Sequence, residues 1–64
     1  MKHRLLNFRR TNGITQIELA KMAGVSPTTI AKLERGGKPS VIVEGKIERA
    51  IDDYYITKEA NNEI

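Results

Sequence analysis

The sequence predicts a compact all-α domain of four to five helices, and three observations support this prediction. Apolar residues make up 39% of the 64 residues, but only 5% are aromatic and tryptophan is absent. This composition suits a small helical core of Leu, Ile, Val and Ala side chains. The apolar residues recur at intervals of three and four, which is the spacing of one face of an α-helix. Finally, Gly, Pro, Ser and Thr stand where helices are expected to begin and end.

Start and stop signals divide the first part of the chain into three short helices, expected over residues 3–11, 16–22 and 27–35. The second begins with Thr15-Gln-Ile-Glu18, a capping box in which the threonine oxygen accepts the backbone N–H of Glu18 and the glutamate reaches back. Ser26 caps the third, and Pro27 occupies its first turn, where the missing N–H costs nothing. The short, glycine-containing connection before it predicts that the second and third helices cross steeply.

A final helix is expected after Pro39-Ser40. It is indicated by apolar residues at helical spacing, namely Val43, Ile47, Ala50, Ile51 and Tyr54. Gly45 lies inside this run and has poor helix propensity, so the helix is expected to begin after Gly45 or to split into two. The domain is expected over 1–56, and the polar tail, 57–64, is expected to fray.

Composition excludes several classes of function. The chain has no cysteine and one histidine, so disulfides and thiolate zinc sites are excluded and a histidine-rich metal site is disfavoured. No apolar run approaches the ~20 residues of a membrane span, and no signal-peptide pattern is present. No pair of carboxylates suggests a catalytic pocket. We therefore expect a soluble cytoplasmic protein that is not an enzyme and uses no cofactor, metal or small-molecule ligand.

Charge is distributed unevenly along the chain. Residues 1–39 carry eight Lys or Arg and two acidic residues, a net charge of +6. Residues 40–64 carry three basic and six acidic residues, a net charge of −3. A basic first part suggests a polyanionic partner such as nucleic acid. Alternatively, the charges are clustered by chance on a solvated surface.

The third expected helix has an outer face suited to a groove. If Ile30 and Leu33 face the core, a wheel of 100° per residue places Thr28, Ala31, Lys32 and Arg35 on the opposite side, with Thr29 at the margin. Small side chains let the backbone approach a groove, and long basic ones reach base edges or phosphates. Alternatively, this is an ordinary solvated helix face.

The segment "TQIELAKMAGVSPTTIAKLERG" carries a joint pattern of residues at fixed spacing. These residues are Thr15-Gln16, Leu19-Ala20, Gly24, Ile30 and Leu33-Glu34-Arg35-Gly36. The pattern resembles the helix-turn-helix of the Cro/CI-type (XRE-like) phage repressors, and the resemblance extends over about residues 4–52. It implies a λ-repressor-like fold that binds double-stranded DNA, and an origin in a phage or mobile element.

The resemblance also implies roles for individual residues. Base-reading positions are Pro27, Thr28, Thr29 and Lys32, and DNA-backbone contacts are Gln16, Ser26, Arg35, Lys38 and Arg10, although Arg10 can equally be a solvated charge. Arg9 and Glu34 correspond to a structural ion pair. After Gly36 the chain departs from the family pattern and the fifth helix is expected to be missing. Tyr54, Tyr55 and Ile56 are candidate contacts of a homodimer, unless Tyr54 completes the core.

The function expected from these residues is transcriptional regulation. A Cro-like repressor would occupy an operator with helix 27–35 in the major groove, as a homodimer at least on DNA. The alternative is a protein-interaction module, resembling an antirepressor or antitoxin, whose partner is a regulatory protein facing the acidic residues of 40–64. Lys32 and Arg35 favour the first hypothesis, because a module that no longer bound DNA would be expected to carry acids there.

Overall fold

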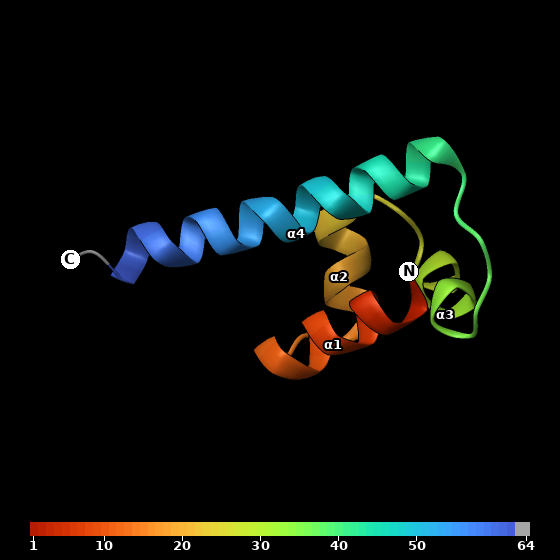
Figure 1. The fold of residues 1–64 in the computed structure, drawn as a ribbon, viewed down its shortest axis with the longest axis horizontal. Coiled ribbons are helices and arrows are strands. Elements are labelled where there is room, and N and C mark those ends of the chain that lie inside the picture. Colours follow the sequence, from red (N-terminus) through yellow and green to blue (C-terminus); the bar gives the residue numbers. More distant parts are fainter. Residues whose placement is uncertain (63–64) are drawn as a thin grey trace.

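The computed structural model describes residues 1–62, which form four α-helices (Figure 1). The helices are α1, Lys2–Asn12; α2, Gln16–Ala23; α3, Pro27–Glu34; and α4, Val41–Asn62. The all-α prediction is confirmed, and the described residues contain four helices and no fifth. The first three helices lie within one or two residues of their expected bounds. They pack on one side of the long α4, with α2 reaching from α4 toward α1 (Figure 1).

Local interactions explain where α2 and α3 begin. The backbone N–H of Glu18 donates to Thr15 Oγ1 over 3.0 Å, and the Thr15 N–H donates to Glu18 Oε1 over 3.3 Å, which confirms the capping box. Ser26 Oγ accepts the backbone N–H of Thr29 over 3.2 Å, and Pro27 occupies the first helical position. Each cap satisfies backbone donors that a helix N-terminus would otherwise leave without a partner.

The turn between α2 and α3 depends on Gly24. Its φ of 71° lies in the left-handed region, which residues with a Cβ rarely adopt. The N–H of Gly24 donates to Lys21 O, and that of Val25 donates to Ala20 O, the hydrogen bonds of a Schellman motif. The chain therefore leaves α2 in a defined direction, and α3 starts after only three intervening residues, Gly24, Val25 and Ser26.

One hydrophobic core joins all four helices. Its fully buried large side chains come one from each helix, namely Leu5, Leu19, Ile30 and Ile47. Ile14 is also buried, although the sequence analysis did not place it in the core; it precedes the Thr15 cap, where an apolar residue can pack against the first turns of the helix. Ile17, in contrast, is 60% exposed, because it lies in the first turn of α2, away from the core.

The prediction of a break at Gly45 was wrong. The structure has one helix from Val41 through Gly45 to Asn62, so most of the tail expected to fray is helical, and residues 63–64 lie outside the described part. Ser40 Oγ accepts the Val43 N–H over 3.2 Å and caps the helix before the glycine. Burial of Ile47, Ala50 and Ile51 then fixes the turns that follow Gly45, which outweighs its poor propensity.

The middle of α4 is also held against the end of α1. The rings of Phe8, Tyr54 and Tyr55 meet edge to face, with centroids 5.3 to 5.7 Å apart. Asn12 Nδ2 donates to the hydroxyl oxygen of Tyr55 over 3.1 Å, and Lys58 Nζ donates to Asn12 Oδ1 over 3.3 Å. The contact orients the end of α4, which projects beyond the other helices (Figure 1).

Candidate nucleic-acid interface

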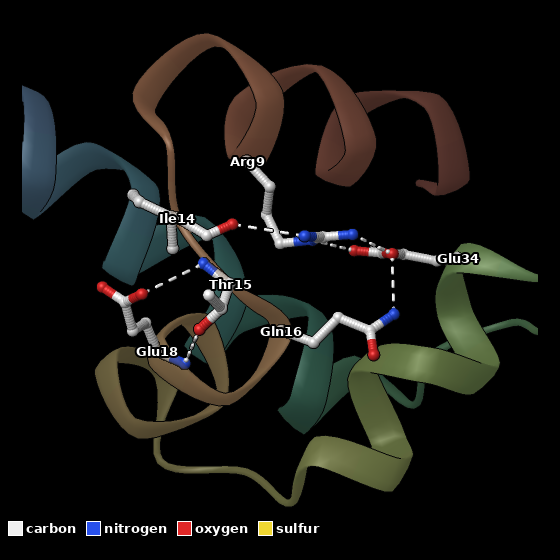
Figure 2. Close-up of polar contacts among 6 residues, drawn as sticks. All are labelled: Arg9, Ile14, Thr15, Gln16, Glu18 and Glu34. Atoms are coloured by element: carbon white, nitrogen blue, oxygen red, sulfur yellow. Dashed lines mark hydrogen bonds and ion pairs between the residues drawn. The ribbon is translucent and has the colours of Figure 1, made fainter.

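A polar network fixes α3 relative to the two preceding helices (Figure 2). The guanidinium of Arg9 on α1 makes a bidentate contact with Glu34 on α3, from Nε to Oε2 over 2.5 Å and from Nη2 to Oε1 over 2.6 Å. Gln16 Nε2, at the start of α2, donates to Glu34 Oε1 over 2.9 Å. Arg9 Nη1 also donates to the carbonyl oxygen of Ile14. One carboxylate thereby joins three helices, and the two residues expected to pair are in direct contact.

The network is largely shielded from water. The Glu34 side chain is 6% exposed and that of Arg9 is 19% exposed. The hydrogen bond from Arg9 lowers the pKa of Glu34; burial opposes this shift, whereas the Gln16 hydrogen bond and the charges of Arg9 and Arg10 add to it. The same hydrogen bond raises the pKa of Arg9. Both groups therefore stay ionised at neutral pH, and the acid of α3 is neutralised inside the protein.

The outer face of α3 consequently carries no acidic side chain. Ile30, Leu33 and Glu34 are buried. Pro27, Thr28, Lys32 and Arg35 are exposed, and Ala31 is half-buried between them. The face combines a small residue near its middle with two long basic side chains. This arrangement matches the outer face expected from the helical wheel.

The four candidate base-reading residues are not equivalent. Thr29 is half-buried, and its hydroxyl oxygen lies 2.9 Å from Ser26 Oγ, so these two hydroxyls share a hydrogen bond. The remaining three, Pro27, Thr28 and Lys32, are exposed. This hydroxyl pair was not predicted from the sequence, although two hydroxyl residues three positions apart at a helix start are a usable signal for it.

Candidate backbone contacts come from the start of α2 and from the two ends of α3. An open groove beside the start of α2 is lined by Arg10 and Gln16, together with Thr15 and Ile17. Gln16 uses one amide N–H on Glu34, and a primary amide has a second to donate. Arg35 and Lys38 follow the C-terminal end of α3 and are exposed in the connection to α4. These residues and Ser26 thus offer donors around α3.

The three candidate dimer contacts differ in their exposure and in the contacts they make within the chain. Tyr54 is half-buried and packs against the core, which is the alternative considered for it. Tyr55 is more exposed but contacts Phe8 and accepts a hydrogen bond from Asn12. Ile56 is 65% exposed. The side chains of Tyr54 and Tyr55 therefore already make contacts within the chain.

Two kinds of site are absent from the described residues. Across 1–62, no helix is both long and apolar enough to span a membrane. Over the same range, no three His, Cys, Asp or Glu residues gather in a way that could bind a metal ion.

Three helices held by one buried ion pair, with a tight turn before a helix whose exposed side is basic, define a helix-turn-helix protein. A family model described as Helix-turn-helix matches residues 5–55. The chain therefore belongs to the XRE-type helix-turn-helix family, as the sequence resemblance predicts. Membership in this family also agrees with the expectation that the chain is not an enzyme.

Two relatives cover nearly the whole chain. A protein of Archaeoglobus fulgidus is 43% identical over 61 residues, which is 88% of this chain and 87% of the relative. A protein of Methanothermobacter thermautotrophicus is 38% identical over 65 aligned positions, covering 92% of this chain and 94% of the relative. Each relative is named an uncharacterized HTH-type transcriptional regulator. No solved structure matches the chain significantly.

Proposed function

We propose that this protein is a sequence-specific regulator of transcription that binds double-stranded DNA with α3 in the major groove. The observation that supports this proposal most strongly is the charge on the outer side of α3. Lys32 on the helix and Arg35 at its C-cap are exposed, whereas the acid of α3, Glu34, is buried and neutralised by Arg9. A DNA duplex presents a row of phosphates that such a face attracts. The names of the two relatives support the same function.

Three exposed residues of α3 are the proposed readers of base edges. Lys32 donates to O6 and N7 of guanine, so each half-site is expected to contain at least one G beneath it. Thr28 donates, accepts or touches a thymine methyl group, and Pro27 offers apolar contact. We expect Thr29 to contribute less to base recognition, because its hydroxyl shares a hydrogen bond with that of Ser26.

The proposed contacts to the DNA backbone surround these readers. Gln16 and Arg10 lie beside the start of α2, Ser26 lies at the start of α3, and Arg35 and Lys38 follow its end. Such contacts set the position of a protein on DNA and do not distinguish sequences. A dimer would place two copies of α3 in successive major grooves, about 34 Å apart, and repress by occupying the operator in the manner of Cro.

The decisive experiment is selection of bound duplexes from a random DNA library, performed with the wild-type protein and with Lys32→Ala. The wild type is expected to enrich a twofold-symmetric motif that contains G·C pairs. Lys32→Ala is expected to lose about ten- to a hundredfold in affinity at the preferred base pair and to relax selection there, because its donor to guanine is removed. Lys46→Ala, on α4, is a matched control that should leave the motif unchanged.

Other results would change the proposal. A uniform loss of affinity for all sequences in Lys32→Ala would make Lys32 a backbone contact. A single half-site motif would retain DNA recognition and remove the dimer. Enrichment of no sequence would refute sequence-specific binding and favour the protein-interaction module.

A further inference from the structure

The buried carboxylate of Glu34 holds a residue that is also a proposed contact to DNA. Gln16, the first residue of α2, donates from Nε2 to Glu34 Oε1 over 2.9 Å (Figure 2). The Glu34 side chain is 6% exposed, whereas Gln16 is half-buried and lines the open groove at the start of α2. Gln16 therefore connects the interior of the protein with the surface proposed to contact the DNA backbone.

The carboxylate determines which way the amide of Gln16 faces. Both oxygens of Glu34 accept hydrogen bonds from the cationic Arg9, so the carboxylate is ionised and can only accept. Rotation of the Gln16 amide by 180° would bring its oxygen against Oε1 of Glu34, and two acceptors with no proton between them repel each other. The amide is therefore held with its nitrogen on the carboxylate, and Figure 2 shows its oxygen pointing away from Glu34.

An amide that is fixed before binding is a better contact for a phosphate than a mobile one. The nitrogen of Gln16 uses one N–H on Glu34 and has a second N–H for another acceptor. A long side chain that becomes ordered only on binding loses rotamer freedom, which reduces affinity. Arg10 lines the same groove and adds a positive charge. The negative charge of Glu34 does not oppose a phosphate there, because Arg9 neutralises it.

We propose that Glu34 is a positioning residue for DNA binding, which holds the amide nitrogen of Gln16 so that its second N–H donates to a DNA phosphate. Gln16 makes the contact, and Glu34 acts only through Gln16. The inference rests on the proposed function and deepens it. It gives the ion pair of Arg9 and Glu34 a role in the affinity for DNA besides its role in joining the helices.

The test is a double-mutant cycle on the affinity for the duplex selected from the random library, measured by fluorescence anisotropy. In the wild-type background, Gln16→Ala is expected to weaken binding about tenfold, because a hydrogen bond to a charged group is lost. The second background carries Arg9→Met and Glu34→Met, since replacing a buried ion pair by apolar residues often leaves stability unchanged. There Gln16 has no anchor, and Gln16→Ala is expected to weaken binding less than about threefold, because the two effects are coupled.

A second pair of substitutions is the matched control. Arg4→Met and Glu48→Met remove the surface ion pair between α1 and α4. Gln16→Ala is expected to keep its effect of about tenfold in this background, because the anchor on Glu34 is intact. Circular dichroism establishes that each chain is folded under the conditions of the measurement. A role of Glu34 in stability alone would lower the affinity with and without Gln16 equally, and would leave the effect of Gln16→Ala unchanged.

A measurement on the free wild-type protein requires no substitution in the ion pair. Gln16 is the only glutamine of the chain, so its side-chain amide gives one unambiguous pair of proton signals in NMR spectra. Nitrogen relaxation is expected to show this amide about as ordered as the backbone of α2, and more ordered than the amide of the exposed Asn7. An amide of Gln16 as mobile as that of Asn7 would contradict the positioning role.

Two results of the cycle would overturn the proposal and leave DNA recognition intact. One is a Gln16→Ala variant that binds the selected duplex as tightly as the wild type, since Gln16 would then make no contact. The other is an equal effect of Gln16→Ala with and without the Arg9–Glu34 pair, since the contact would then not depend on Glu34. A wild type that enriches no duplex would instead refute the proposed function, and the positioning role with it.

Discussion

The carboxylate of Glu34 shows how much of this small fold depends on a single residue. It accepts two hydrogen bonds from Arg9 and one from Gln16, and so contacts two other helices. An ion pair removed from water is costly to break by deleting one partner, because the other charge stays buried without compensation. A surface pair such as Arg4–Glu48 carries no such penalty, since water solvates either charge when the other is lost.

Replacing Glu34 should therefore destabilise the protein. Glu34→Ala is expected to lower the free energy of unfolding by about 3 kcal/mol, because it leaves the guanidinium of Arg9 without its counter-charge. Urea denaturation followed by circular dichroism measures the change. Glu48→Ala is the matched control and is expected to cost less than about 1 kcal/mol. Equal effects of the two substitutions would refute a special role for the buried pair.

The same carboxylate should make stability depend on pH. The pKa of Glu34 is lowered in the folded protein, chiefly by the hydrogen bond from Arg9. The unfolded chain therefore binds its proton first as pH falls, and the stability gained from the ionised group is lost between the ordinary glutamate pKa and the lower folded value. Glu34→Gln removes this component. Urea midpoints measured from pH 7 down to pH 3 should fall less steeply in the variant than in the wild type.

At the scale of elements, glycine has opposite effects on stability at a helix end and in a helix interior. Gly24 occupies a left-handed conformation that ends α2, and a side chain there would be strained. Gly45 has ordinary helical surroundings in the interior of α4, with open space where a Cβ would lie. Its cost is the conformational entropy that glycine loses when it is fixed in a helix.

Alanine substitution should separate these two cases. Gly45→Ala is expected to stabilise the fold by about 1 kcal/mol, because it adds helix propensity without a clash. Gly24→Ala is expected to destabilise it by about 1 kcal/mol or more, because alanine must adopt the left-handed conformation. Thermal unfolding at low protein concentration, where self-association does not contribute, should show shifts of opposite sign. A lower melting temperature for Gly45→Ala would mean that the fold requires glycine at this position.

At the scale of the whole molecule, the two halves of the charge pattern occupy different parts of the fold. The basic residues 1–39 contain α1, α2 and α3, and the acidic residues 40–64 include α4, which lies along one side of these helices (Figure 1). The proposed DNA contacts all lie on the first part. An acidic helix would be repelled by phosphates, which suits it better to contact protein than DNA.

Much of the fold could be predicted from the amino-acid sequence alone. The capping box at Thr15, the start of α3 at Ser26-Pro27 and the turn at Gly24 all depend on hydrogen bonds or backbone preferences within a few residues. The buried side of α3 followed from the helical period, and with it the exposure of Thr28 and Lys32. Interactions between residues close in the sequence determine these features, so short stretches of sequence are enough to predict them.

Only the tertiary structure decided the features that depend on residues distant in sequence. The continuity of α4 through Gly45 requires burial of Ile47 and Ile51 against the other helices, which outweighs the local propensity. The engagement of Tyr54 and Tyr55 depends on the position of Phe8 at the end of α1. In each case, contacts between helices settle what the local sequence leaves open, because packing free energy exceeds the small differences in propensity.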